Sequence, residues 1–159
     1  MVDDNVLDNE IQLVVFKLGS EEFGVDISQV KEIIRVGDIT RIPGSPPFVD
    51  GVINLRGQVT TVVNLRSRLG LGGKNADSNA RIMIMEVQKN TVGVIVDSVA
   101  EVKYMSSKDI EPLPEALSSS ISSEYIQGVG KLSGRLLILV NLKQIILDDT
   151  LKLSRGVAA

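Results

Sequence analysis

The chain has 159 residues, 43% of them apolar and 23% charged, with a formal net charge of −3, which is typical of a globular domain and offers no basic face for nucleic acid. It contains no cysteine and no histidine. It therefore lacks disulfides, thiolate and imidazole nucleophiles, cysteine or histidine zinc sites and a phosphorylatable histidine, and these absences restrict its function more than any motif does.

The first ten residues carry four acidic side chains in place of the basic and apolar regions of a secretory signal. No apolar run in the sequence reaches the ~18 residues of a membrane span. We therefore expect a cytoplasmic protein with a disordered acidic tail at residues 1–10 and a second tail at residues 148–159.

The first half predicts short β-strands, because apolar and β-branched runs alternate with turn residues. A short helix should follow Asn64, which is a good N-cap residue, with Leu65 and Leu69 facing inward. In chain order, the expected elements are a strand at 11–18, a turn at Gly19-Ser20, a second strand, a segment containing Val30, Ile33 and Ile34, a Pro-rich turn at 43–47, a hairpin with its turn at Arg56-Gly57, the helix, and a connector at 70–79.

The second half repeats this pattern. Residues 51–65 and 128–142 align without gaps and share seven identities, where composition alone would give about one. Upstream, residues 23–33 align with residues 92–102. The offset is 69 residues upstream (92 − 23) and 77 residues in the hairpin (128 − 51), so the second copy is about eight residues longer, most simply within 112–123. We interpret this similarity as an internal duplication, the alternative being the generic likeness of β-hairpins.

The duplication predicts two small five-stranded β-barrels, each ending in a helix. The second helix should follow Asn141 and turn Leu142, Ile145 and Ile146 inward. We expect a first subdomain at about 17–80 and a second at about 81–147, with possible strand exchange from residues 11–16.

Motifs for phosphate chemistry fail on their spacing. GLGG at residues 70–73 follows no predicted strand and is most simply a linker. GVGKLSG at 128–134 contains Gly-Lys, but a P-loop would need glycine where Tyr125 stands and Ser or Thr where Leu132 stands. Four acidic residues fall at related points of the two copies, which favours architecture over catalysis: Asp26, Glu32, Asp97 and Glu101.

The segment INLRGQV at 53–59 allows two interpretations. It is a hairpin in which Gly57 supplies a positive φ and Arg56 is simply solvated, or Arg56 serves a partner or pairs internally with Glu32. The second copy keeps the surrounding glycine and leucine residues but has Ser133 at the matching position. A scaffold alone would not require the guanidinium, so both accounts stay open.

Three segments resemble the family of CheW-like chemotaxis coupling proteins. GVINLRG, followed by QVTTVVNLRSRLG, is similar to the signature of that family; FKLGSEEFGVDISQVKEIIR and TRIPGSPPFVDGVINLRG resemble its first half, and YIQGVGKLSGRLLILVNLKQII its second. The resemblance covers about residues 11–147. Thr61 stands where the family usually has Pro, and Asn64 where Asp is common, which puts the local strand and helix cap in question.

This resemblance implies two intertwined SH3-like barrels and a non-enzymatic adaptor without cofactor or metal. The family's partners are the cytoplasmic hairpin tip of methyl-accepting chemoreceptors and the regulatory domain of the histidine kinase CheA, which would place the chain at membrane-bound receptor arrays. By similarity, receptor contact would involve a groove between the subdomains with Val30, Glu32, Gly51 and Arg56, and kinase contact would use barrel surfaces.

Two other classes of function fit these residues less well. An enzyme would have to use carboxylates and lysines alone, and no motif for one is present. A nucleic-acid-binding barrel would carry a basic stripe with aromatic side chains for stacking, and this chain has neither. The adaptor is the interpretation that the sequence favours.

Overall fold

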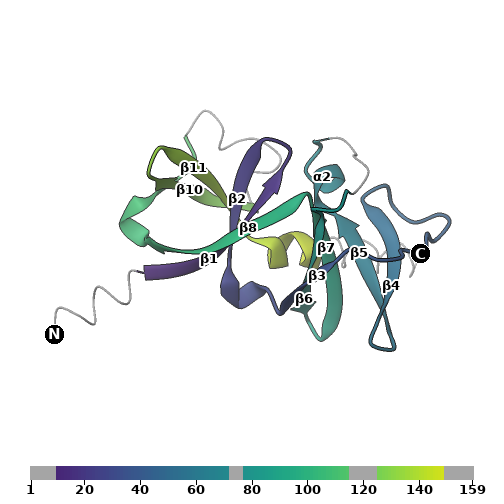
Figure 1. Cartoon of the computed structure of the whole chain (residues 1–159). Helices are drawn as coiled ribbons and strands as arrows, with labels where there is room; N and C mark the ends of the chain where they lie inside the picture. The colour runs from purple at the N-terminus through teal and green to yellow at the C-terminus, as the bar shows by residue number, and fades with distance from the viewer. Residues whose placement is uncertain (1–9, 72–76, 115–124, 149–159) are drawn as a thin grey trace.

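The computed structural model describes residues 10–71, 77–114 and 125–148, and its strands form two sheets (Figure 1). The six-stranded sheet consists, in spatial order, of β8 (Ser98–Ser106), β1 (Glu10–Leu18), β2 (Glu21–Asp26), β11 (Arg135–Val140), β10 (Ile126–Leu132) and β9 (Ile110–Glu111). The five-stranded sheet consists of β3 (Glu32–Arg35), β6 (Arg81–Val87), β7 (Asn90–Val96), β5 (Gln58–Asn64) and β4 (Val49–Leu55).

The helical elements of the described residues are short: η1 (Ile27–Gln29), α2 (Leu65–Arg68), η2 (Ser107–Asp109) and a helical segment at 142–148. The prediction of a mainly β fold with two similar SH3-like units and short helices is confirmed, except that one unit has six strands and not five.

Each sheet combines strands from both halves of the sequence. The β1–β2 hairpin joins the second half through a parallel pairing in which Gly24 lies opposite Leu139. The β6–β7 hairpin joins the first half in the same way, with Gly93 opposite Val62. Gly24 and Gly93 are 69 positions apart and Val62 and Leu139 are 77 apart, which are the offsets of the sequence repeat. The two junctions are therefore equivalent under the duplication.

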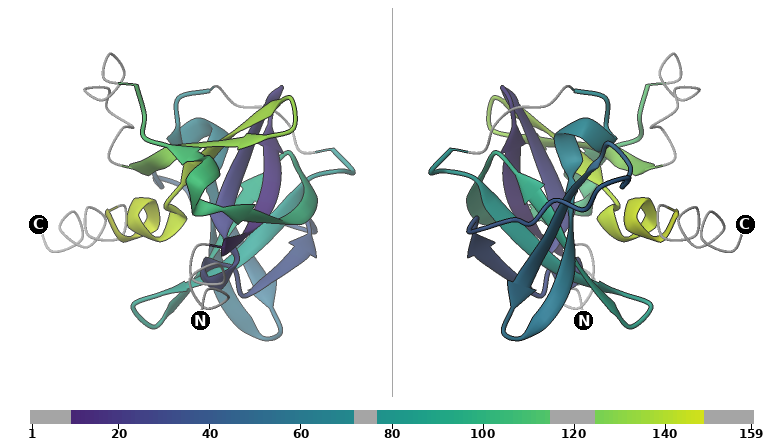
Figure 2. Two further views of the ribbon diagram at one scale, coloured as in Figure 1. Left: turned by 90° about the vertical axis from the view of Figure 1, so that its left-hand side faces the viewer. Right: turned by 90° about the vertical axis from the view of Figure 1, so that its right-hand side faces the viewer.

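The exchange involves whole hairpins. In Figure 2 the purple β1–β2 hairpin lies against the yellow-green β10–β11 hairpin, although the two come from opposite ends of the described chain. The exchanged segment thus extends beyond residues 11–16, because β2 stays paired with β1 along six residues. The sheets consequently cross the expected subdomain limits of 17–80 and 81–147, and the definition of domains along the chain stays a prediction.

Neither sheet closes into a barrel through a pairing of its own two edge strands in the described residues. The chain itself connects the edges instead. In the six-stranded sheet, edge strand β8 runs through η2 into β9 at the other edge. In the five-stranded sheet, the segment after β3 reaches β4, where Thr40 forms an isolated bridge with Val52. Each sheet is thus a curved, SH3-like unit that is open along part of its seam.

The core is aliphatic and has three parts. The largest cluster lies between the sheets and receives Leu142, Ile145 and Ile146 from the helix at 142–148, as the helical spacing predicted (Figure 1). Smaller clusters lie within the two units, around Ile82 and Ile84 in one and around Leu137 and Leu139 in the other. The mixed strand origin of all three means that the halves fold around one another.

Candidate functional site

Arg56 and Glu32 form a bidentate ion pair at the tip of the β4–β5 hairpin. Arg56 Nη1 donates to Glu32 Oε1 at 3.2 Å, and Nη2 donates to Oε2. Glu32 lies at the start of β3, so the pair ties the hairpin tip to the edge strand of the same sheet. The Arg56 side chain remains 67% exposed, against 30% for Glu32. The internal pairing that the sequence left open is confirmed, yet most of the guanidinium still faces solvent.

The backbone of the turn orients Arg56. Leu55 lies opposite Gln58, and the two residues between them have positive φ angles of 49° for Arg56 and 89° for Gly57. Positive φ at both central positions is the geometry of a tight turn that matches the twist of a hairpin, and Gly57 adopts it without strain. Gly57 N also donates to Asn54 Oδ1 at 2.7 Å. The turn is held from within and presents Arg56 outward.

The second copy has an ion pair in the corresponding place. Arg135 Nη2 donates to Glu101 Oε2 at 2.9 Å, and Arg135 Nε lies 3.2 Å from Glu22 Oε1. Glu101 is the repeat equivalent of Glu32, but Arg135 lies two residues after Ser133, the equivalent of Arg56. The guanidinium that a gap-free alignment shows as lost is thus supplied from the next strand, which the sequence analysis missed. A search two positions to either side of Ser133 would have found it.

Both glutamates ionise more readily than usual. The hydrogen bond from Arg56 holds the pKa of Glu32 below its ordinary value of 4.5. The hydrogen bond from Arg135 lowers the pKa of Glu101 in the same way. The arginine pKa values shift upward in return. These are surface ion pairs whose main effect is to fix the two side chains, because solvent screens exposed charges.

Gly51 is buried and does not share the surface position of Arg56. It lies at a bulge of β4 with φ 145°, and a Cβ built there would be 2.2 Å from the carbonyl oxygen of Thr40. Val30 follows η1, two residues before β3, and packs against the main core while partly exposed. The structure thus joins Glu32 to Arg56 directly, places Val30 beside Glu32 in the chain, and gives Gly51 a packing role. The assignment of all four to receptor contact stays a prediction.

The two units expose apolar side chains at equivalent positions, which the sequence analysis also missed. Val59 and Leu136, 77 residues apart, are 79% and 63% exposed on β5 and β11. Ile33 and Val102, 69 residues apart, are likewise exposed on β3 and β8. Large exposed apolar residues that recur at duplicated positions mark candidate contact surfaces. The repeat offsets, applied to solvent-facing strand positions, could have revealed them.

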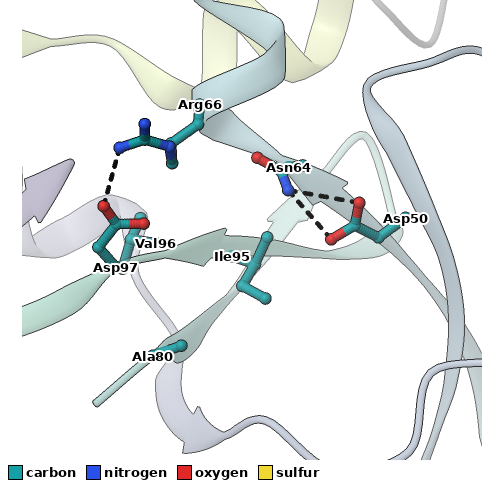
Figure 3. A pocket seen from close by; sticks show the side chains of 7 residues that line it. All are labelled: Asp50, Asn64, Arg66, Ala80, Ile95, Val96 and Asp97. Atoms are coloured by element: carbon teal, nitrogen blue, oxygen red, sulfur yellow. Dashed lines mark hydrogen bonds and ion pairs between the residues drawn. The ribbon is translucent and has the colours of Figure 1, made fainter. Parts of the chain in front are cut away.

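A small pocket lies where α2 meets β7, and its polar groups satisfy one another (Figure 3). Arg66 Nη1 donates to Asp97 Oδ2 at 3.0 Å, and the same carboxylate accepts a hydrogen bond from Gly19 N at 2.6 Å. On the other side of Ile95, the Asn64 side chain donates to both carboxylate oxygens of Asp50 at 3.2 and 3.4 Å. The carboxylates of this pocket serve structure, as the sequence had indicated for Asp97.

No three acidic side chains of the described residues come together in a way that could hold a metal ion. None of the helices in the described ranges has the length and apolar content for a membrane crossing. The surface features that recur in both units are the exposed apolar positions and the ion pairs at the hairpins, which are typical of proteins that contact other proteins.

Comparison with known proteins agrees with this class. The family model of the CheW-like domain matches residues 12–149. The chain is 34% identical over 147 residues to the chemotaxis protein CheW of Klebsiella aerogenes, and the match covers 92% of this chain and 88% of that protein. It is also 34% identical over 144 residues to the chemotaxis protein CheW of Treponema pallidum, where the match covers 88% of this chain and 84% of that protein. The crystal structure of the scaffolding protein CheW from Thermoanaerobacter tengcongensis matches with a TM-score of 0.76 and 35% identity, covering 85% of this chain and 86% of that one. The chain belongs to the CheW-like family of chemotaxis proteins.

Proposed function

We propose that this chain is a non-enzymatic adaptor that couples methyl-accepting chemoreceptors to the histidine kinase CheA, binding both and helping to assemble signalling arrays at the membrane. Its relatives are named as chemotaxis and scaffolding proteins. The observation that supports receptor contact best is the Arg56–Glu32 pair. An outward-facing guanidinium is held on a tight turn by a carboxylate that leaves it largely exposed.

Receptor contact at this site has a physical basis in the way helices bind grooves. The cytoplasmic tip of a chemoreceptor is a helical hairpin, and such helices bind grooves through an apolar stripe with polar groups at its edge. Val30 would contribute apolar surface beside β3, and Arg56 a planar donor for carbonyl or carboxylate groups at the edge. Gly51 would act indirectly, by allowing β4 to approach Thr40 and so positioning the strand that leads to Arg56.

The experiment compares two equivalent arginines. Affinity for a receptor signalling fragment is measured by calorimetry for the wild type, Arg56→Gln and Arg135→Gln, together with the thermal unfolding of each protein. We expect Arg56→Gln to weaken binding at least fivefold with little change in unfolding temperature, because exposed pairs contribute little stability. Arg135→Gln, which breaks the equivalent pair of the other unit, should bind as the wild type. Equal effects of both changes, or none, would contradict the receptor assignment.

Kinase contact is proposed for the apolar positions of the units. The family resemblance implies a kinase regulatory domain homologous to this chain, so a surface that occurs once per unit suits a partner with a similar repeat. Val59→Asp and Leu136→Asp should each reduce capture of that domain, since a charge would enter an apolar contact. Gln127→Asp, on an exposed position of β10, is the control. Retained capture by both apolar variants would exclude these surfaces.

A further inference from the structure

Two arginines lie directly opposite one another on neighbouring strands of the five-stranded sheet. Arg35 is the last residue of β3, and in the antiparallel register it pairs with Arg81, the first residue of β6. Side chains of directly opposed residues project from the same face with their Cβ atoms about 5 Å apart, and like charges in that position destabilise a sheet. In contrast, Lys17 lies opposite Glu22 in the other sheet, which is favourable. No other strand pair of the described residues places two cations opposite one another.

No carboxylate of the described residues neutralises these two arginines. Arg35 is exposed and has neither a hydrogen bond nor an ion pair there. Arg81 uses Nη1 to donate to the carbonyl oxygens of Ser78 and Ala80 at 3.0 and 2.8 Å, which orients the guanidinium and leaves its charge uncompensated. The register of β3 and β6 thus places two positive charges together near the edge of a sheet, with no compensating carboxylate among the described residues.

The surroundings of the two arginines are apolar on one side. Ile33 alternates with Glu32 and Ile34 along β3, so it projects from the same face as Arg35, and it is 38% exposed. Its cross-strand neighbour Met83 belongs to the core between the two sheets. The face that carries Arg35 and Arg81 is therefore the face toward the other unit, at its open edge. It presents an apolar side chain beside two cations.

We propose that Ile33, Arg35 and Arg81 form a docking surface for an acidic position on the receptor's helical hairpin. A single carboxylate can bridge two guanidinium groups, and the neighbouring turn of an amphipathic helix would supply the apolar group that covers Ile33. Val30, two residues before β3, packs against the same core between the sheets as Met83, so this surface lies on the side of the sheet that Val30 of the proposed receptor site faces, while Glu32 projects from the other face. The inference rests on the proposed receptor contact and adds a specific demand on the partner, a carboxylate beside an apolar residue.

Removal of either charge should weaken receptor binding without destabilising the free protein, because it relieves the repulsion between the two arginines. Binding of a receptor signalling fragment is measured for the wild type, Arg35→Gln, Arg81→Gln and the double variant, at two salt concentrations, with Lys108→Gln as a charge-matched control on the other unit. We expect each single change to weaken binding roughly three- to fivefold, the double change to flatten the salt dependence, and the unfolding temperature to stay equal or rise.

The possible outcomes separate the inference from the proposed function. If the wild type does not bind the fragment, the receptor contact fails and the inference fails with it. If the wild type binds and the double variant binds equally well, the docking surface alone is refuted. A fall in unfolding temperature that parallels the loss of binding would make the arginines structural. Wild-type binding to vesicles of anionic lipid that is lost in the double variant, with fragment binding intact, would assign the surface to lipid and overturn the proposal.

Discussion

Asn64 and Asn141 occupy the same structural position in the two halves of the molecule. The backbone N–H of Asn64 donates to the carbonyl of Phe48 at 2.7 Å, and that of Asn141 donates to the carbonyl of Tyr125 at 2.8 Å. Each side chain then caps a helix by accepting a hydrogen bond from the backbone N–H three residues later, at 3.2 Å from Ser67 and 3.1 Å from Gln144. The two caps differ in what surrounds them, and this difference can be tested.

We predict that Asn64→Asp is destabilising and that Asn141→Asp is nearly neutral. The Asn64 amide donates to the carboxylate of Asp50, so a carboxylate at position 64 would lose that bond and repel Asp50. Asn141 Oδ1 instead accepts from the Gln29 amide, which would serve a carboxylate equally well. Chemical denaturation at pH 7 should show a loss of about 1–2 kcal/mol for the first variant and less than about 0.5 kcal/mol for the second.

The cost of Asn64→Asp should shrink in acid, because protonation of one carboxylate removes the repulsion. Addition of Asp50→Asn to the first variant should recover part of the lost stability at pH 7. An equal loss of stability from both aspartate substitutions would show that the surroundings of the caps do not matter. Asn64, one of the two residues at which this chain departs from the family pattern, would then have no structural effect.

The repeat could be predicted from the sequence, and exchange was expected for residues 11–16, but the exchange of whole hairpins could not be predicted. Gly24 and Gly93 are equivalent, as are Val62 and Leu139, so pairing β2 with β5 would bring together the same kinds of residues as the observed pairing with β11. Local patterns cannot distinguish between equivalent strand edges. Tertiary packing decides between them, through the shared core that contains Phe16 from β1 and Met83 from β6.

The candidate site was predicted only in part for a related reason. The Glu32–Arg56 pairing was one of the alternatives that the residues left open, because both side chains could be placed on the hairpin pattern. Arg135 escaped notice because its function moved two residues along the chain while the backbone frame was kept. Ser133 lies in the turn and Arg135 is the first residue of β11, so in the second unit a long arginine at the start of the strand reaches the glutamate that a turn arginine reaches in the first unit.

The unfolding free energy should fall in acid partly through Glu32 and Glu101. Their pKa values are lowered in the folded protein, so they contribute stability above the unfolded value near 4.5, and this stability is lost as pH falls through the folded pKa values. We expect urea unfolding of Glu32→Gln/Glu101→Gln to depend less on pH below about 4.5 than that of the wild type. The control is Glu86→Gln/Glu111→Gln, which changes the net charge by the same amount. If this pair reduced the pH dependence of the unfolding free energy equally, the effect would be due to net charge and not to the two arginine partners.

Gly51 should tolerate no side chain. A Cβ at this position would meet the Thr40 carbonyl oxygen at 2.2 Å, and the φ of 145° disfavours any residue with a Cβ. We expect Gly51→Ala to lower the unfolding free energy by at least about 2 kcal/mol, because backbone strain adds to the clash. Gly37→Ala is the matched control, since nothing lies within 4 Å of its added Cβ. Near-equal unfolding midpoints for the two variants would contradict the close approach of β4 to Thr40.

Thr60→Val should stabilise the protein. Thr60 is 1% exposed on β5, and its hydroxyl oxygen has no hydrogen-bond partner among the described residues. The equivalent position in the second half is Leu137, fully buried, so the fold itself has no need of a polar group there. Because valine has nearly the same shape, the change removes the unsatisfied hydroxyl without opening a cavity. We expect the unfolding free energy measured in urea to rise by about 1 kcal/mol.

The control is Thr61→Val, one residue along the strand and partly exposed, which should change the unfolding free energy little. A loss of stability in Thr60→Val would mean that the hydroxyl is hydrogen-bonded in solution, and the assignment of this position as purely apolar would be wrong.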